Sequence, residues 1–126
     1  MTRFSEIVMD HFQDPRHRGV LPEATHTGTV GEPGRGPYFV LQLRVRNGRV
    51  MAASFQCNAC GITIACGSLL VEWLQGRPLA ECVLFTTTDL TELAGGLPSD
   101  KQHCAHMAIA ALQAALTPPM PMTGGL

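Results

Sequence analysis

Residues 38–57 read YFVLQLRVRNGRVMAASFQC, and this stretch decides the fold. Its first half alternates between apolar and polar side chains, a pattern that predicts a strand with one buried face. Asn47-Gly48 then favours a tight turn, and the second half returns as another strand. We therefore expect an antiparallel hairpin over residues 38–57. The expected buried face of its first strand carries Phe39, Leu41, Leu43 and Val45.

The segments around the hairpin predict one more strand and several helices. Residues 24–30 are suited to a third strand, and the Gly- and Pro-rich GEPGRGPY that follows must be a loop. The predicted helices cover residues 3–13, 61–75, two short stretches within 78–95, and 99–116. The candidate N-caps are Thr2 or Ser5 for the first helix, Thr88 or Asp89 for the second of the two short helices, and Ser99 for the last. Strands grouped before most of the helices indicate an α+β fold, in which a three-stranded antiparallel sheet has helices packed on one face.

Length and composition restrict the class of protein. A chain of 126 residues is expected to form one domain over residues 1–117, followed by a flexible Pro- and Gly-rich tail over 118–126. The net charge of −1 gives no electrostatic reason to expect nucleic acid or a membrane surface as a partner. No apolar run is long enough for a signal peptide or a membrane span. Five cysteines in such a chain indicate the reducing cytoplasm, where clustered thiols are more often ligands or catalysts than disulfides.

The cysteines fall at places where elements begin and end. Cys57 and Cys60 lie between the return strand and the buried helix, and His103-Cys104 begins the last helix. A thiol at a helix N-terminus is exposed to unpaired N–H groups and to the positive end of the helix dipole, which lower its pKa. Cys-x-x-Cys together with a distant His-Cys is a plausible ligand set for zinc or an iron–sulfur cluster. Cys66 and Cys82 are interpreted as core residues.

These motifs resemble those of the IscU/NifU-type iron–sulfur cluster scaffold proteins over nearly the whole chain. SEIVMDHFQDPRHRG, VGEPGRGPYFVLQLRV, FQCNACGITIACGSLLVEWLQGRPL and DKQHCAHMAIAAL occur in the family's order and spacing. The resemblance implies an IscU/SufE-like fold without catalytic activity of its own. It implies a protein that holds a [2Fe-2S] cluster, or zinc, through three cysteines and an aspartate or histidine. It also implies two kinds of partner: a cysteine desulfurase that supplies sulfur, and apoproteins that accept the cluster.

By position in the family's motifs, Cys60 corresponds to the second cluster cysteine, and His103 and Cys104 correspond to the His-Cys pair. The chain departs from the pattern in two places. Arg35 stands where the first cysteine is expected and Pro37 where the aspartate is expected, and neither side chain can coordinate a cation. The chaperone-recognition segment reads LPSDK at residues 97–101, which changes its central pair and makes handover through that chaperone doubtful.

Three outcomes of the missing ligands remain open. Cys57 could replace the absent cysteine, giving the set Cys57, Cys60, His103 and Cys104, provided that CNAC leaves the strand and turns. Alternatively, Arg35 beside a thiol could stabilise a thiolate or a persulfide in a sulfur carrier. In the third outcome Arg35 is a solvated loop residue over a nonfunctional site or over a site that a homo-oligomer completes.

A thiol enzyme is the alternative from a different functional class. In it, Cys60 or Cys104 would be the nucleophile, and His103 or His106 its base. Adjacent residues diverge around a helix, and this favours His103 and Cys104 converging on a shared ion over direct proton transfer between them. We therefore predict a cluster-assembly scaffold-like binding protein without enzyme activity. His11, His17 and His26 show no partners in the sequence and are interpreted as surface or core polar residues.

Overall fold

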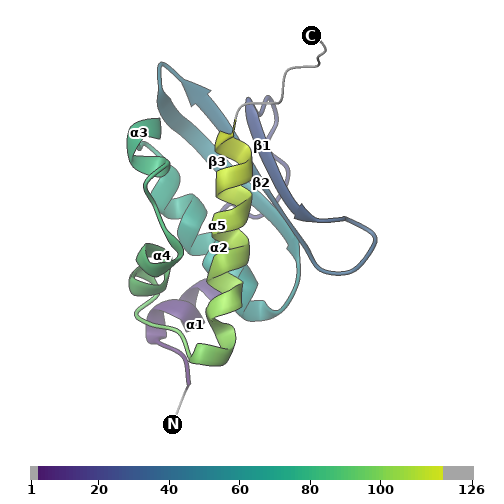
Figure 1. Cartoon of the computed structure of the whole chain (residues 1–126), viewed down its shortest axis with the longest axis vertical. Helices are drawn as coiled ribbons and strands as arrows, with labels where there is room; N and C mark the ends of the chain where they lie inside the picture. Colours follow the sequence, from purple (N-terminus) through teal and green to yellow (C-terminus); the bar gives the residue numbers. More distant parts are fainter. Residues whose placement is uncertain (1–2, 118–126) are drawn as a thin grey trace.

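The computed structural model describes residues 3–117, so the tail expected at 118–126 lies outside the described residues. It is an α+β fold, as the sequence predicts (Figure 1). The elements in chain order are α1 (Glu6–Gln13), β1 (His26–Gly31), β2 (Tyr38–Arg46), β3 (Arg49–Asn58), α2 (Gly61–Leu74), α3 (Leu79–Cys82), α4 (Thr87–Leu93), a 3-10 turn η1 (Ser99–Lys101) and α5 (Gln102–Leu116).

The three strands form one antiparallel sheet in the order β1-β2-β3, which confirms the predicted sheet. Asn47 and Gly48 both have positive φ angles, 55° and 73°, as a two-residue type I′ turn requires. One prediction about the strands is wrong. A register shift between Arg44 and Val45 interrupts the alternation, so Val45 is half-buried instead of lying fully in the core.

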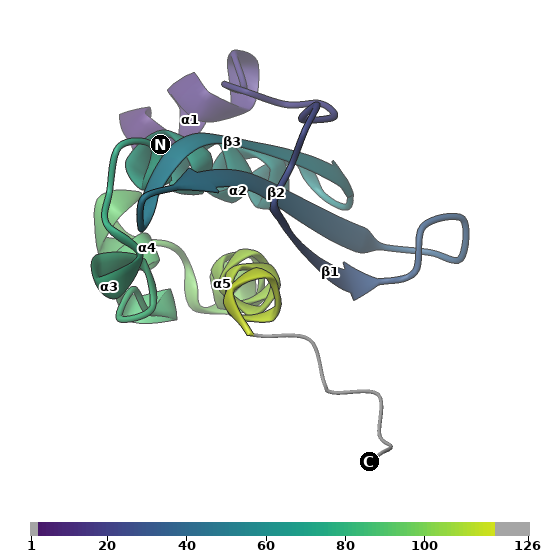
Figure 2. The same ribbon diagram turned by 90° about the horizontal axis from the view of Figure 1, so that it is seen from above.

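Helices α2 and α5 cover the apolar face of the sheet (Figures 1 and 2). Helix α5 lies over β1 and β2, helix α2 lies over β3, and α1 packs against α2. The contact between β1 and α5 requires glycine at position 28, because a Cβ atom there would lie 2.0 Å from the carbonyl oxygen of Ala111. The approach of the two backbones therefore fixes α5 on the sheet.

The segment between α1 and β1 crosses the side of the sheet away from α5 (Figure 2). Gly19 N–H donates to the carbonyl oxygen of Phe55 on the edge strand β3, at 2.8 Å. Leu21 N–H donates to the side-chain oxygen of Gln42 at 2.9 Å, and Thr25 N–H donates to the carbonyl oxygen of Leu43 at 2.8 Å. These bonds satisfy groups at the edge and on the outer face of the sheet that no helix covers.

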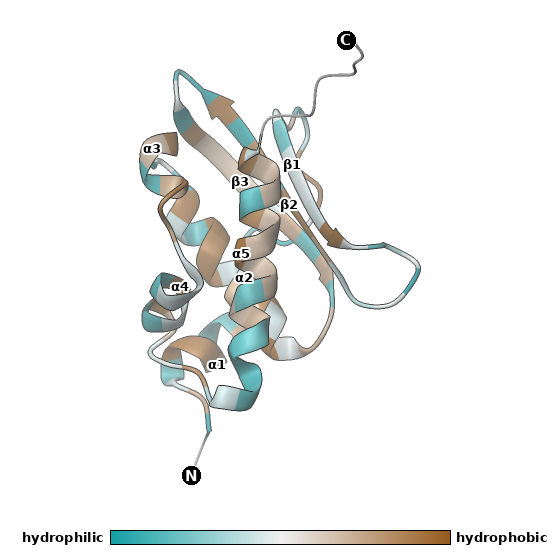
Figure 3. Ribbon diagram, viewed as in Figure 1, coloured by the Kyte–Doolittle hydropathy of each residue, from teal (hydrophilic) through white to brown (hydrophobic). Residues whose placement is uncertain are grey.

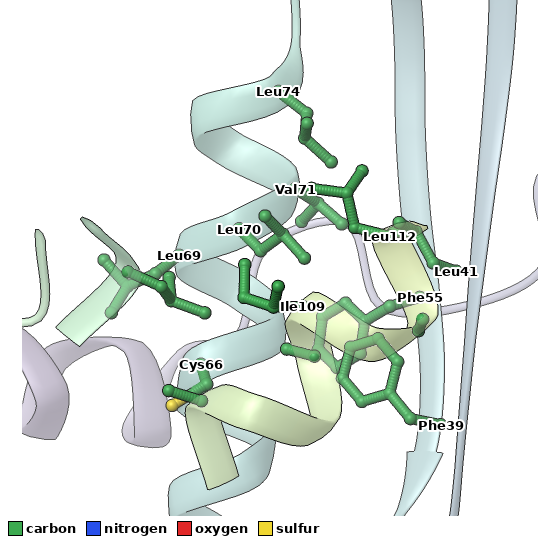
Figure 4. Packing of buried hydrophobic residues seen from close by; sticks show 14 of the residues in the cluster. Phe39, Leu41, Phe55, Cys66, Leu69, Leu70, Val71, Leu74, Ile109 and Leu112 are labelled. Carbon is green, nitrogen blue, oxygen red and sulfur yellow. The ribbon is translucent and has the colours of Figure 1, made fainter. Parts of the chain in front are cut away.

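The core lies between the sheet and the two long helices (Figures 3 and 4). Phe39 of β2 and Phe55 of β3 stack with their ring centroids 5.6 Å apart, directly beneath α2. Cys66 and Cys82 are completely buried, which confirms that they are core residues. Helix α2 is apolar on most sides, as expected for a helix covered by the sheet, α1 and α5.

Several predicted helix starts are shifted. Ser5 caps α1, as one of the two alternatives proposed, and its Oγ accepts a hydrogen bond from Val8 N–H at 3.0 Å. Helix α4 is capped by Thr86, which forms a reciprocal capping box with Asp89, instead of by Thr88 or Asp89. Ser99 opens the 3-10 turn and does not cap α5, which begins only at Gln102.

Candidate metal and sulfur site

Two helix starts bring the predicted thiols together at one end of the molecule (Figure 1). Strand β3 ends at Asn58, and two residues later Cys60 is the N-cap residue of α2. Cys104 lies in the first turn of α5, beside His103. The Sγ atoms of Cys60 and Cys104 are 3.5 Å apart although the residues are 44 positions apart in the chain.

The spacing of these donor atoms fits ligands of a tetrahedral ion. Zinc–sulfur bonds of about 2.3 Å in a tetrahedral site place two sulfurs about 3.8 Å apart, close to the 3.5 Å between Cys60 and Cys104. His103 Nε2 lies 3.6 Å from Cys104 Sγ, near the spacing of about 3.5 Å between a nitrogen and a sulfur ligand. The three groups do not close into one set, because no three His, Cys, Asp or Glu side chains within residues 3–117 are placed to hold a metal ion.

Cys60 is the exposed and acidic thiol of the pair. Loss of water around its sulfur raises the pKa, but hydrogen bonds outweigh this effect and lower the pKa to about 7. The contributing groups are the Thr63 hydroxyl, 3.5 Å from the sulfur, the backbone N–H groups of Thr63 and Ile62, and the Cys104 thiol. A substantial fraction of Cys60 is therefore thiolate near neutral pH, which is the form that binds metals and attacks sulfur.

Cys104 differs from Cys60 in both its exposure and the pKa of its thiol. Its side chain is completely buried, and burial raises the pKa of its thiol despite the Thr63 hydroxyl and the positive charge of Lys101. The nearby Cys60 raises it further. The pair is thus best described as a Cys60 thiolate that accepts a hydrogen bond from the Cys104 thiol.

Cys57 occupies a different environment from the other predicted ligands. It is the register partner of Phe39 on the core face of the sheet, and its side chain is 6% exposed. Burial raises the pKa of its thiol to about 11, although Arg18 acts in the opposite direction. Because β3 continues to Asn58, the turn that CNAC would need begins only after Cys57. Its role as a ligand stays a prediction.

Arg35 has the geometry of a solvated loop residue. It is exposed and lies 3.6 Å from Glu32, with which it forms an ion pair. No contact between Arg35 and a thiol is present among the described residues. Sequence reasoning missed a second cation, Arg18, whose guanidinium donates to the carbonyl oxygen of Cys57 at 3.4 Å.

Sequence reasoning also missed Thr63 and the partner of His11. The Thr63 contact has a local signal, because the third residue after an N-cap lies beside the cap side chain, within reach of its own hydroxyl. His11 is buried on α1, with Nδ1 2.7 Å from Ser68 Oγ on α2. No local signal could have revealed that contact, which joins residues 57 positions apart.

Comparison with known proteins decides the family. The family model described as the NifU-like N-terminal domain matches residues 3–118. The chain belongs to this family. Relatives of this NifU-like domain include the iron-sulfur cluster assembly scaffold protein IscU of Escherichia coli K12, 37% identical over 117 residues that cover 90% of this chain and 91% of the relative. IscU 1 of Archaeoglobus fulgidus is 35% identical over 113 residues, covering 90% and 74%.

Solved structures support the fold of the NifU-like domain. A structure described as a putative iron-sulfur cluster assembly scaffold protein for the SUF system, from Fervidobacterium islandicum AW-1, superposes with a TM-score of 0.73 at 14% identity, covering 90% of this chain and 96% of that one. The NifU-like N-terminal protein of Brucella abortus gives a TM-score of 0.68 at 15% identity, covering 88% and 90%. No helix within residues 3–117 is long and apolar enough to cross a membrane.

Proposed function

We propose that this NifU-like domain is an iron–sulfur cluster assembly scaffold that receives its cluster at Cys60, Cys104 and His103. The observation that carries the proposal is the 3.5 Å approach of two cysteine sulfurs at the starts of two helices. Named relatives support it, because those above are called assembly scaffold proteins. One relative, from Drosophila melanogaster, is instead called an assembly enzyme.

The cluster or ion is cargo, and these three residues alone are an incomplete ligand set for a cluster. A [2Fe-2S] cluster needs four protein ligands, whereas Cys60, Cys104 and His103 provide three. The fourth would come from Cys57, if residues 57–60 rearrange away from the core, or from a second copy of the chain. Zinc is the simpler cargo, because water or a partner group can complete its coordination.

The test is anaerobic reconstitution with ferrous iron and sulfide, read by metal analysis and by the visible absorption spectrum. We expect Cys60→Ser and Cys104→Ser to lose most of the bound iron and sulfide. Cys82→Ala is the matched control, since this buried thiol lies outside the site, and it should retain the cargo. Retention of the full cluster by Cys60→Ser would refute the proposal.

The fourth ligand is tested separately with Cys57→Ala and with the molar mass of the reconstituted protein. If Cys57 is the ligand, its removal weakens binding as much as Cys104→Ala does, and the loaded protein stays monomeric. If a second copy completes the site, Cys57→Ala retains its cargo and loading doubles the mass.

A second function, acceptance of persulfide sulfur, is favoured by the exposed Cys60 thiol with a pKa of about 7. The Cys60 thiolate would attack the outer sulfur of a cysteine desulfurase persulfide. A new sulfur–sulfur bond forms on Cys60, and the desulfurase cysteine leaves as its thiolate. Incubation with a desulfurase and cysteine should then add the mass of one sulfur atom to the wild-type chain and none to Cys60→Ser.

The desulfurase and the apoprotein acceptors are thus proposed partners. Residues 97–101 do not support binding of the chaperone, because the central pair of the LPSDK segment differs from that of the family's recognition segment. Lys101, the last residue of this segment, lies directly before α5. The cytoplasmic location expected from the cysteines stays a prediction.

A further inference from the structure

A groove of about 660 Å³ lies between the second half of α2 and helices α3 and α4. Its floor is apolar and is formed by Trp73, Phe85 and Leu93. Three carboxylates line it as well, those of Glu81, Asp89 and Glu92. Its volume is in the range of ligand-binding clefts, but it is open to solvent along its length, which suits a segment of polypeptide.

An apolar side chain remains exposed at this groove. Leu84 lines it and is 74% exposed. The rings of Trp73 and Phe85 stack with centroids 3.8 Å apart and form the aromatic floor. A large apolar residue left in water beside a packed aromatic pair is typical of a docking site.

The charges around the groove select the partner. Asp89 accepts a hydrogen bond from Thr86 N–H in the capping box, and Glu81 lies 3.4 Å from Arg77. The carboxylate of Glu92 has no hydrogen bond or ion pair within residues 3–117. The Arg77 guanidinium is held 4.0 Å from the centre of the Trp73 ring and neutralises only one of the three carboxylates. The rim therefore keeps a net negative charge.

We propose that this groove binds a basic amphipathic segment of another protein. Apolar side chains of the segment would pack on Leu84 and on the edge of the Trp73 ring that Phe85 and Arg77 leave uncovered, and its lysines or arginines would face Glu92 and Asp89. A helix from a second copy of this chain does not fit, because none of the helices α1 to α5 contains a lysine or an arginine. The occupant must then carry basic residues that this chain's helices lack.

The groove is separate from the thiols. Trp73 follows Cys60 by thirteen residues, a distance of about 20 Å along α2. A partner held in the groove would therefore leave the sulfur pair open to a sulfur donor or a cluster acceptor. The groove would act as an anchoring surface and would take no part in ligand binding.

The experiment uses Trp73, which is the only tryptophan of the chain, as the reporter. The probe is a synthetic amphipathic helical peptide with leucines on one face and lysines on the other. We expect a saturable change in tryptophan emission, with an affinity that falls about tenfold between low and high salt. Leu84→Ala and Glu92→Gln should each weaken binding by about threefold or more.

The matched controls are Val20→Ala and Glu23→Gln, which remove an exposed apolar group and an exposed charge elsewhere. Both should bind the peptide like the wild type, and so should Cys60→Ser, which makes this test independent of the cluster proposal. Equal binding of the same peptide with glutamate in place of lysine would overturn the proposal. So would an unchanged affinity of Glu92→Gln, or concentration-dependent dimerisation that Leu84→Ala abolishes.

Discussion

His11 shows how a single buried histidine can join two helices. Its Nδ1 lies 2.7 Å from Ser68 Oγ, and that oxygen also accepts a hydrogen bond from Arg16 N–H at 2.8 Å. The Ser68 hydroxyl hydrogen is then available to His11 Nδ1, an arrangement that suits the neutral ring with its proton on Nε2. Glu72 lies 3.7 Å from Nε2 but is largely exposed.

This contact predicts that the fold loses stability in mild acid. Burial, followed by the charge of Arg16, lowers the pKa of His11 below its ordinary value of 6.5, so the unfolded chain binds a proton that the folded chain resists. The stabilising effect is complete above the ordinary pKa of 6.5 and is lost as the pH falls below it, through the lowered pKa of the folded chain. Urea unfolding should give a smaller free energy at about pH 5.5 than at about pH 7.5.

The variant His11→Asn separates this residue from the other histidines. Asparagine can keep a hydrogen bond to Ser68 but cannot take up a proton, so the free energy of unfolding should depend less on pH. His106→Asn, at an exposed position, should keep the slope of the wild type. Equal slopes for His11→Asn and the wild type would assign the acid sensitivity to another group.

The same scale shows what the sequence could reveal about individual residues. Cys60 was predictable as a helix-start thiol because the change from strand to helix periodicity is local. The role of Cys57 was left open by the sequence; the two-residue strand period explains its burial, because it places Cys57 with Phe55 on the core face. The contacts of His11 with Ser68 and of Cys57 with Arg18 depend on how α1 and the following loop return to the core.

At the scale of elements, replacing Gly67 of α2 tests whether helix propensity or core packing has the larger effect on stability. Alanine at an interior helix position normally gains about 1 kcal/mol over glycine. Here a Cβ atom would lie 2.7 Å from the Phe55 ring and 2.9 Å from the Phe39 ring, at the centre of the core (Figure 4). Because both rings are fully buried and stacked, we expect Gly67→Ala to lower the free energy of unfolding by about 1–3 kcal/mol.

Chemical unfolding of Gly67→Ala beside Gln113→Ala tests this directly. Gln113 is an exposed residue of α5, so alanine there should be neutral or gain a few tenths of a kcal/mol. If Gly67→Ala were more stable than the wild type, the two rings would have to move aside, and the packing between α2 and the sheet would be able to adjust.

Elements were predictable where their signals are local. The β2–β3 hairpin was fixed by alternation and Asn47-Gly48 within one short stretch, and its bounds agree to one residue. The start of α5 was misplaced because Ser99, a good cap, follows Pro98 and enters a 3-10 turn first. The choice between successive candidate caps depends on backbone angles that neighbouring elements impose.

At the scale of the whole molecule, the topology brings two helix starts to one end and thereby forms the thiol pair. The sequence predicted that Cys60 and Cys104 would meet, since a small α+β domain often gathers strand ends and helix starts at one edge. It could not place Arg35, because a loop with three glycines has no periodic pattern that fixes its direction. The groove between α2, α3 and α4 could not be predicted from the sequence either, because its shape depends on how two short helices pack on a long one.

An ion held by this pair would link α2 to α5 and should stabilise the whole fold. Because the unfolded chain does not hold the two sulfurs together, Zn²⁺ at about 100 times its dissociation constant should add about 2.7 kcal/mol to the free energy of unfolding. Urea unfolding with zinc and with a chelator measures this difference. Cys60→Ser should lose most of the gain and Cys82→Ala should keep it. An equal gain in Cys60→Ser would place the ion elsewhere and leave the close approach of the sulfurs as packing between two helix ends.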